Sequence, residues 1–80
     1  MMTLREARAR RVLTVRGLAE VAGVAPATVY RLEHRRSAPR FNVIRALSAA
    51  LDVEPTEIAE FAAAIEAAAV ADRSAEEAGR

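Results

Sequence analysis

Arginine is the residue type of this chain best suited to binding another molecule, because all twelve of its cationic side chains are guanidiniums. A guanidinium presents N–H donors in a planar fork that matches phosphate oxygens and the edge of guanine. Residues 1–45 hold ten arginines against three acids, a net charge of +7, whereas residues 46–80 hold two against eight, a net charge of −6. This asymmetry predicts that the first half meets a polyanion. Ordinary solvated charge on helix surfaces is the alternative interpretation.

Patterns of catalytic or metal-binding residues are missing from the sequence. His34 is the single histidine, there is no cysteine, and no glycine-rich phosphate loop or suitably placed carboxylate pair occurs. These residues provide neither a nucleophile with its base nor a ligand set for a metal. We therefore expect no enzyme activity, no metal and no cofactor.

The length of 80 residues predicts one small domain. No run of about 18 apolar residues is present, so no membrane span is expected. The start of the chain is charged from Arg5 onward and lacks the apolar stretch of a signal peptide. A cytoplasmic location is the resulting expectation.

Apolar periodicity predicts an all-α fold of five helices. The predicted helices cover about residues 4–12, 15–22, 26–34, 41–51 and 55–72, and residues 73–80 are expected to fray. Thr3 and Glu6 form a capping-box pattern, and Thr14 is a second N-cap candidate. Gly23 is suited to end the second helix, and Pro26 is suited to begin the third.

The fourth and fifth helices are predicted from apolar spacing and from proline. Apolar residues of the fourth helix recur at 3-3-4 spacing, at Phe41, Ile44, Leu47 and Leu51. Pro55 is expected to start the fifth helix, since proline suits the first helical position.

Residues 15–34 form a helix-turn-helix pattern, in which two short helices are joined by a glycine turn and the second carries arginine. Ala19 is small where the two helices are expected to cross closely, and Gly23 makes the turn. Val24, Val29 and Leu32 are expected to anchor the pair in the core.

The stretch from Leu13 to Glu33, LTVRGLAEVAGVAPATVYRLE, resembles the lambda-repressor-like (Cro/C1, or XRE) family of helix-turn-helix DNA-binding proteins. The similarity continues through residues 39–41 and 47–53, and it covers about residues 3–61 in all.

The resemblance implies a five-helix DNA-binding domain over residues 1–61, followed by an Ala-rich C-terminal helical extension and frayed tail over residues 62–80. Arg8 and Glu33 match two residues that form an ion pair between the first and third helices in this family. Such a pair has a structural role, and it contributes little net stability if it is exposed.

The resemblance also implies that residues 26–34 form a recognition helix in the major groove of DNA. The DNA-contacting residues implied on it are Pro26, Ala27, Thr28, Tyr30 and Arg31. Arg31 can grip the O6 and N7 atoms of guanine, and Ala27 and Thr28 can touch thymine methyl groups. Tyr30 either contacts a phosphate or sugar or has a packing role.

Phosphate contacts are implied on both sides of this helix. Thr14 and Arg16 would hold a phosphate at the start of the second helix, together with free backbone N–H groups. Arg36, Arg40 and Asn42 would flank the opposite backbone, because the loop and the start of the fourth helix face DNA in this family. For each arginine taken singly, a solvated surface charge is the alternative.

Several positions depart from the family pattern; they are Val15, Gly17, Ala25, Pro26, Ala27 and Arg35. Val15 replaces a glutamine that contacts DNA, and Arg35 replaces the glycine that usually follows the recognition helix. Gly17 and Ala25 replace residues that cap helices. These departures weaken base-specific reading and leave the fold and phosphate binding intact.

The C-terminal extension predicts a dimer. A helical extension of two turns is marginal in water on its own, and alanine permits close approach of a second helix. Ala62, Ile65 and Ala69 are expected to build a two-fold interface that spaces two recognition helices about 34 Å apart. A frayed tail, or a helix folded back on its own domain, is the alternative.

The function implied is a transcriptional regulator, acting as a repressor, that binds a palindromic DNA site as a homodimer. A protein-interaction role, as an adaptor or as the antitoxin subunit of a toxin–antitoxin pair, is the second hypothesis because one fold serves several functions. Salt dependence separates the two, since binding that neutralises phosphates weakens steeply with salt.

Overall fold

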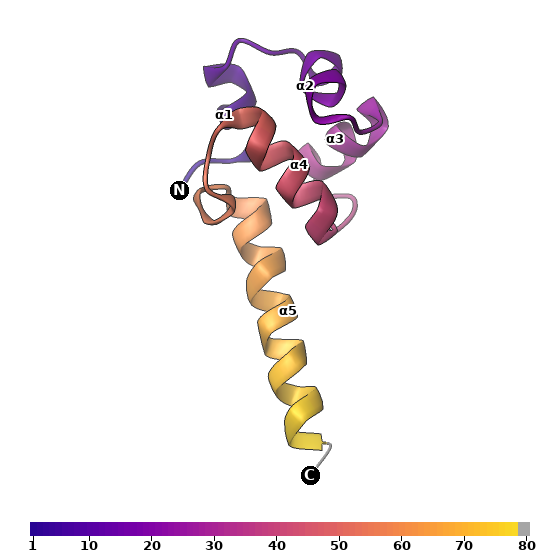
Figure 1. Cartoon of the computed structure of the whole chain (residues 1–80), viewed down its shortest axis with the longest axis vertical. Coiled ribbons are helices and arrows are strands. Elements are labelled where there is room, and N and C mark those ends of the chain that lie inside the picture. The colour runs from indigo at the N-terminus through magenta and orange to yellow at the C-terminus, as the bar shows by residue number, and fades with distance from the viewer. Residues whose placement is uncertain (79–80) are drawn as a thin grey trace.

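The computed structural model describes residues 1–78, with side chains through residue 75, and over that range it is helical with no sheet. The elements are α1 (Leu4–Arg10), α2 (Val15–Ala22), α3 (Pro26–Glu33), α4 (Phe41–Leu51), the 3-10 turn η1 (Pro55–Glu57) and α5 (Ala59–Ala78). Helices α1 to α4 gather into a globular unit, and α5 leaves it as a single rod (Figure 1). The predicted all-α helix-turn-helix fold is confirmed.

Each of the five α-helices contributes to one core. The buried apolar residues are Leu4, Ala7, Leu18, Ala19, Val29, Leu32, Ile44, Leu47, Leu51, Ile58 and Phe61. Ala19 is buried where α2 packs on its neighbours, as predicted from its size. Phe41 is 52% exposed, although it opens the apolar row of α4. It is the first residue of that helix, and the buried part of the row begins one turn later at Ile44.

The predicted starts of the first three helices are confirmed. The Thr3 hydroxyl accepts a hydrogen bond from the Glu6 N–H, and the Glu6 carboxylate accepts one from the Thr3 N–H, both at 3.1 Å. The Thr3 N–H and the Thr3 hydroxyl both donate to the Glu6 carboxylate, and these two hydrogen bonds hold the pKa of Glu6 below its usual value. The Thr14 hydroxyl accepts from the Gly17 N–H at 2.9 Å, and Pro26 begins α3.

Four helices end in the same way, at a residue with left-handed backbone. These residues are Val12, Gly23, Arg35 and Asp52, with φ of 55°, 72°, 54° and 54°. In each case the N–H of the next residue returns to a carbonyl five residues earlier, as in a Schellman motif; the four bonds are Leu13 to Arg8, Val24 to Ala19, Arg36 to Arg31 and Val53 to Ser48.

At two of these left-handed turns the helix ends earlier than predicted. The first helix stops at Arg10 instead of about Val12, because the chain turns left-handed at Val12. The third stops at Glu33, with His34 as its C-cap.

The prediction that the fifth helix begins at Pro55 is wrong. Pro55 begins the short turn η1, and Ile58 is extended and buried before α5 starts at Ala59. Ile58 forms an isolated bridge with Met2, and the Met2 carbonyl accepts from the Ala59 N–H at 2.8 Å. The N-terminal segment therefore fixes where α5 begins.

The C-terminal half of the molecule also differs from the prediction. Helix α5 continues to Ala78, so the fraying that was expected over residues 73–80 is wrong for residues 73–78. The remainder of the predicted tail, Gly79 and Arg80, lies outside the described residues. None of the helices that the structure describes is both long and apolar enough to cross a membrane.

Candidate nucleic-acid interface

The turn between α2 and α3 depends on the backbone of Gly23. Its φ of 72° favours glycine, and nothing lies within 4 Å of the place where a Cβ would stand. Glycine is therefore needed here for its conformation and not for space. On the far side of the turn, Val29 and Leu32 bury one face of α3 and leave the opposite face to solvent.

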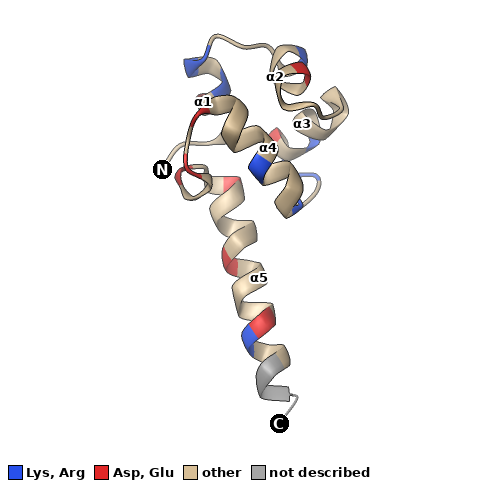
Figure 2. Cartoon of the chain, viewed as in Figure 1, with Lys and Arg blue, Asp and Glu red and all other residues tan. Residues whose placement is uncertain are grey.

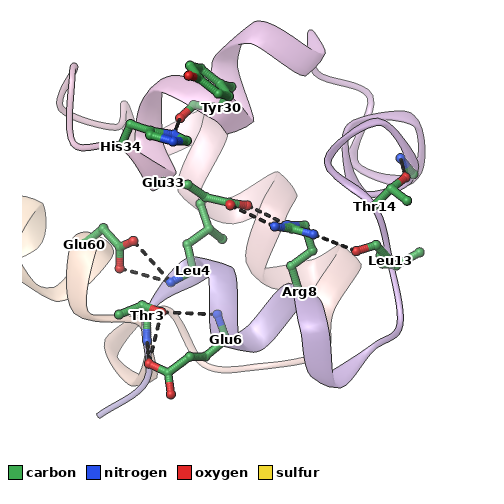
Figure 3. A network of polar contacts seen from close by, with 11 residues as sticks. Thr3, Leu4, Glu6, Arg8, Leu13, Thr14, Tyr30, Glu33, His34 and Glu60 are labelled. Carbon is green, nitrogen blue, oxygen red and sulfur yellow. Dashed lines mark hydrogen bonds and ion pairs between the residues drawn. The ribbon is translucent and has the colours of Figure 1, made fainter.

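A bidentate and largely buried salt bridge fixes α3 against α1. Arg8 Nε donates to Glu33 Oε2 at 2.6 Å, and Arg8 Nη2 donates to Glu33 Oε1 at 2.9 Å (Figure 3). The Arg8 side chain is 16% exposed and that of Glu33 is 4% exposed. The hydrogen bond from Arg8 to Glu33 raises the pKa of Arg8. This confirms the ion pair implied by the family resemblance, and it sets the angle at which α3 is presented.

The third nitrogen of the Arg8 guanidinium extends this bridge to the start of α2. Arg8 Nη1 donates to the Leu13 carbonyl oxygen at 2.9 Å, just before the N-cap Thr14. One side chain thus connects α1 with α3 and with the segment that leads into α2.

The exposed face of α3 carries the residues of this helix that are predicted to contact DNA. Pro26, Ala27, Tyr30 and Arg31 are exposed, and Thr28 is half-buried. Arg31 is the one arginine within α3. Its side chain takes part in none of the hydrogen bonds or salt bridges found among the described residues.

The Tyr30 ring has two neighbours at the end of α3. Its ring stacks on that of His34 with centroids 4.0 Å apart, and the Arg36 guanidinium lies 6.0 Å from the ring centroid. His34 Nδ1 lies 2.8 Å from the Tyr30 carbonyl oxygen (Figure 3). Tyr30 nevertheless remains 45% exposed, so the ring is both packed and accessible. The four-residue spacing of Tyr30 and His34 was the only sequence signal for this stack.

The predicted phosphate-binding residues lie in the segments that precede and follow α3 in the chain. Arg16 is exposed in the first turn of α2, and the Thr14 hydroxyl there accepts the Gly17 N–H and keeps its own proton to donate. On the other side, Arg40 is the N-cap of α4 without a side-chain capping bond, and Asn42 is exposed.

Sequence reasoning missed Phe41, which lies between Arg40 and Asn42. Its half-exposed ring is part of the same surface segment as these two residues. The apolar spacing of α4 had suggested a buried residue, and only the position at the very start of the helix argued against burial.

The arginines of the basic half divide into structural and available groups. Besides Arg8, Arg11 is engaged within the fold, where its Nε donates to the Leu51 carbonyl at 3.0 Å and its Nη2 lies 3.4 Å from Asp52. Figure 2 shows that basic residues otherwise gather on α1–α4 and their loops, while α5 carries mainly acidic ones. Of the ten residues predicted to contact DNA, Thr28 is half-buried and the others are exposed.

In the part of the chain that the structure describes, no cluster of acidic or histidine side chains could hold a metal ion.

Comparison with known proteins gives one match. A protein-family model described as a helix-turn-helix domain matches residues 2–61, three quarters of the chain. No curated protein and no solved structure matches. The matched range stops at Phe61, the last buried residue of α5 among those whose side chains the structure describes.

Proposed function

Because this chain belongs to the helix-turn-helix domain family, we propose that it is a DNA-binding regulator of transcription whose helix α3 lies in the major groove. The observation that carries the proposal is the exposed basic surface on a rigidly held helix pair. Arg31 and Arg36 lie on it without carboxylate partners among the described salt bridges, while the buried bridge between Arg8 and Glu33 sets the orientation of α3.

Base reading would rest mainly on Arg31. Its fork can grip a guanine, a contact worth about 1–3 kcal/mol of discrimination, and Ala27 and Thr28 offer surface to thymine methyl groups. Pro26 at the start of α3 supplies no polar contact. Discrimination between DNA sequences would therefore be limited, with one strongly read base in each half-site.

Affinity would come from phosphate contacts on both sides of the groove. Thr14 and Arg16 would hold one backbone through the hydroxyl, the guanidinium and the first N–H groups of α2. Arg36, Arg40 and Asn42 would hold the other, and Tyr30 would lie against a sugar or phosphate near Arg36.

We further propose that two copies bind a palindromic site through pairing of their α5 helices, and that the bound dimer represses transcription by occupying the promoter. Of the three residues expected at the interface, Ala69 is exposed, while Ala62 and Ile65 are half-buried. Ile65 already packs against the core of its own domain. Action on DNA would place the protein in the cytoplasm.

Selection of bound duplexes from a random pool tests this function. We expect a palindromic consensus that contains guanine in each half-site. Arg31→Ala should erase the preference at that guanine, whereas Arg16→Ala and Arg40→Ala should weaken all sequences alike and reduce the salt slope by about one unit. Equal losses on specific and random DNA for all three variants would refute direct reading by Arg31.

A protein-interaction role, as an adaptor or antitoxin subunit, is the second candidate. It is favoured by the small residues Ala25, Pro26 and Ala27 at the start of α3, which offer few polar contacts to bases. Binding of a protein through apolar surface would change little with salt, whereas binding to duplex DNA would fall steeply.

A further inference from the structure

His34 is the single histidine of the chain, and the contacts proposed so far with DNA leave it without a role. It is the C-cap of α3 and is exposed. Tyr30 and Arg31 precede it on α3, and Arg35 and Arg36 follow it in the loop. Because an imidazole changes its charge between about pH 5 and 8, a histidine among these cations can make the binding of an anion depend on pH.

One hydrogen bond indicates which nitrogen of the neutral His34 ring carries the hydrogen. Nδ1 lies 2.8 Å from the Tyr30 carbonyl oxygen, and a carbonyl oxygen only accepts, so Nδ1 is the donor (Figure 3). Nε2 takes part in none of the hydrogen bonds found among the described residues. A second proton therefore binds at Nε2, where it adds an N–H donor to an exposed ring and leaves the first hydrogen bond intact.

Two contacts hold this ring in place before any ligand binds. Besides the hydrogen bond from Nδ1, the His34 ring stacks on Tyr30, with centroids 4.0 Å apart and an angle of 27° between the ring planes. The face of an aromatic ring attracts a cation, so the stack is compatible with the doubly protonated imidazole. Because the side chain is already ordered, an anion that binds at Nε2 loses little affinity to the ordering of the ring.

The acid of α3 is not free to pair with this imidazole. Glu33 precedes His34 in the chain, but its carboxylate is occupied by the bidentate salt bridge to Arg8 of α1. The Glu33 side chain is also only 4% exposed. Glu6, the acid of α1, is engaged with Thr3. Neither carboxylate therefore serves as the partner of a charged His34.

The loop after α3 and the first half of α5 add mainly positive charge. They border a groove of about 500 Å³, which is lined by Arg35, Arg36 and Glu60 among others. Both carboxylate oxygens of Glu60 accept from the first N–H of α1. The Arg36 guanidinium lies 6.0 Å from the centroid of the Tyr30 ring, on which His34 stacks. A charged imidazole thus joins a group of cations, and an anion from outside the chain is its favourable partner.

The position of His34 along α3 favours a phosphate, and not a base, as that anion. Recognition helices contact base edges with their N-terminal residues. His34 lies at the other end of α3, and its four-residue spacing from Tyr30 places it on the same side of the helix. It also lies two residues before Arg36, which is proposed to hold the DNA backbone.

We propose that His34 is a further DNA-contacting residue, whose doubly protonated ring donates from Nε2 to a backbone phosphate. This inference rests on the proposed DNA binding and adds the uptake of a proton to it. In the neutral ring Nε2 presents a lone pair, which a phosphate oxygen cannot use. The complex therefore binds protons more strongly than the free chain does, and affinity for duplex DNA rises as pH falls.

Binding of one duplex at two pH values tests this contact. The full-length chain is titrated at constant ionic strength at about pH 8 and about pH 5.5, near the limits of the range in which histidine titrates. The parent should bind about tenfold more tightly at the lower pH for each bound copy, because an adjacent opposite charge makes a group about ten times harder to deprotonate. Its salt slope should also steepen by about 0.9 for each copy.

His34→Gln and His34→Arg are the matched variants. Glutamine is neutral at both pH values, so His34→Gln should bind with one affinity at both. Arginine is charged at both, so His34→Arg should bind at about pH 8 as tightly as the parent does at about pH 5.5. Circular dichroism at each pH checks that the variants are folded. In the parent, the imidazole C–H signals of the single histidine should titrate at a higher pH with duplex than without it.

The outcomes separate this inference from the proposed function. The same pH dependence in the parent and in His34→Gln would overturn the contact and leave DNA binding in place. Imidazole signals that titrate at one pH with and without duplex would do the same, even if a variant did not fold. Failure of the parent to bind duplex DNA at either pH would overturn the proposed function, and the His34 contact with it.

Discussion

Val12 has a backbone conformation that a β-branched residue rarely adopts, with φ of 55°. The side chain is 91% exposed, so it gains no packing in return. A left-handed residue costs about 1–2 kcal/mol relative to glycine, partly offset by the greater entropy of glycine in the unfolded chain. Val12→Gly should therefore stabilise the protein by about 1 kcal/mol, and raise the melting temperature by about 4–8 °C.

Gly23→Ala is the matched control, since it makes the reverse change at a left-handed position with free space around it. It should destabilise by about 1 kcal/mol in the same thermal melts. A loss of stability in Val12→Gly would show that the α1 turn is not strained in solution.

The Arg8–Glu33 pair should behave as a buried ion pair. Removing one partner leaves the other charge buried, so Glu33→Leu should cost about 3–5 kcal/mol in urea unfolding. The double variant Arg8→Met/Glu33→Leu should cost less than Glu33→Leu alone, because no uncompensated charge remains. Additive losses would mean that the two side chains are solvated independently.

At the scale of elements, the start of α5 depends on a contact with α1. The Leu4 N–H donates to both carboxylate oxygens of Glu60, at 3.0 and 3.2 Å (Figure 3). Leu4 is the first residue of α1, where a negative charge is favourable. Glu60→Ala should destabilise by about 1 kcal/mol and should speed hydrogen exchange of the Leu4 amide. Unchanged exchange at Leu4 would rule out this cap.

The capping box of α1 should respond to acid. The pKa of Glu6 is lowered by hydrogen bonds from Thr3, so the folded state favours the carboxylate. The stabilisation is present above the ordinary carboxyl pKa and is lost as pH falls through the lowered value. The stability difference between the parent and Glu6→Gln should therefore shrink below about pH 4, as measured by urea unfolding. A difference independent of pH would contradict it.

The starts of α1 to α4 could be predicted from sequence, whereas the ends of α1 and α3 could not. Thr3 and Thr14 act through a local hydroxyl, so residue type alone indicated the cap. Val12, Arg35 and Asp52 end helices without the glycine that usually marks such a turn. Each of these turns is closed by a backbone hydrogen bond that any residue type can make, so the sequence does not mark it.

The start of α5 was predicted wrongly for a related reason. Pro55 suits the first position of any helix, including the 3-10 turn that it in fact opens. The bridge between Ile58 and Met2 joins residues from distant parts of the chain, so no local pattern announced it.

At the scale of the molecule, charge and the helix-turn-helix spacing predicted the basic surface, but not which arginines are available. Arg8 and Arg11 bind within the fold, while Arg16 and Arg31 are exposed. That division follows from three-dimensional neighbours such as Glu33. The groove between the loop and α5 was equally hidden, because it forms between segments about 25 residues apart.

Binding of a fluorescent duplex as a function of salt tests the central claim most directly. Three arginines per copy, Arg16, Arg36 and Arg40, are proposed to neutralise phosphates. With about 0.9 counterions released per phosphate, a bound dimer should show a slope near −5 in log K against log salt. Tight binding at low salt with a slope of about that size is the predicted result. Failure to bind duplex DNA at low salt, or binding that does not change with salt, would contradict the account.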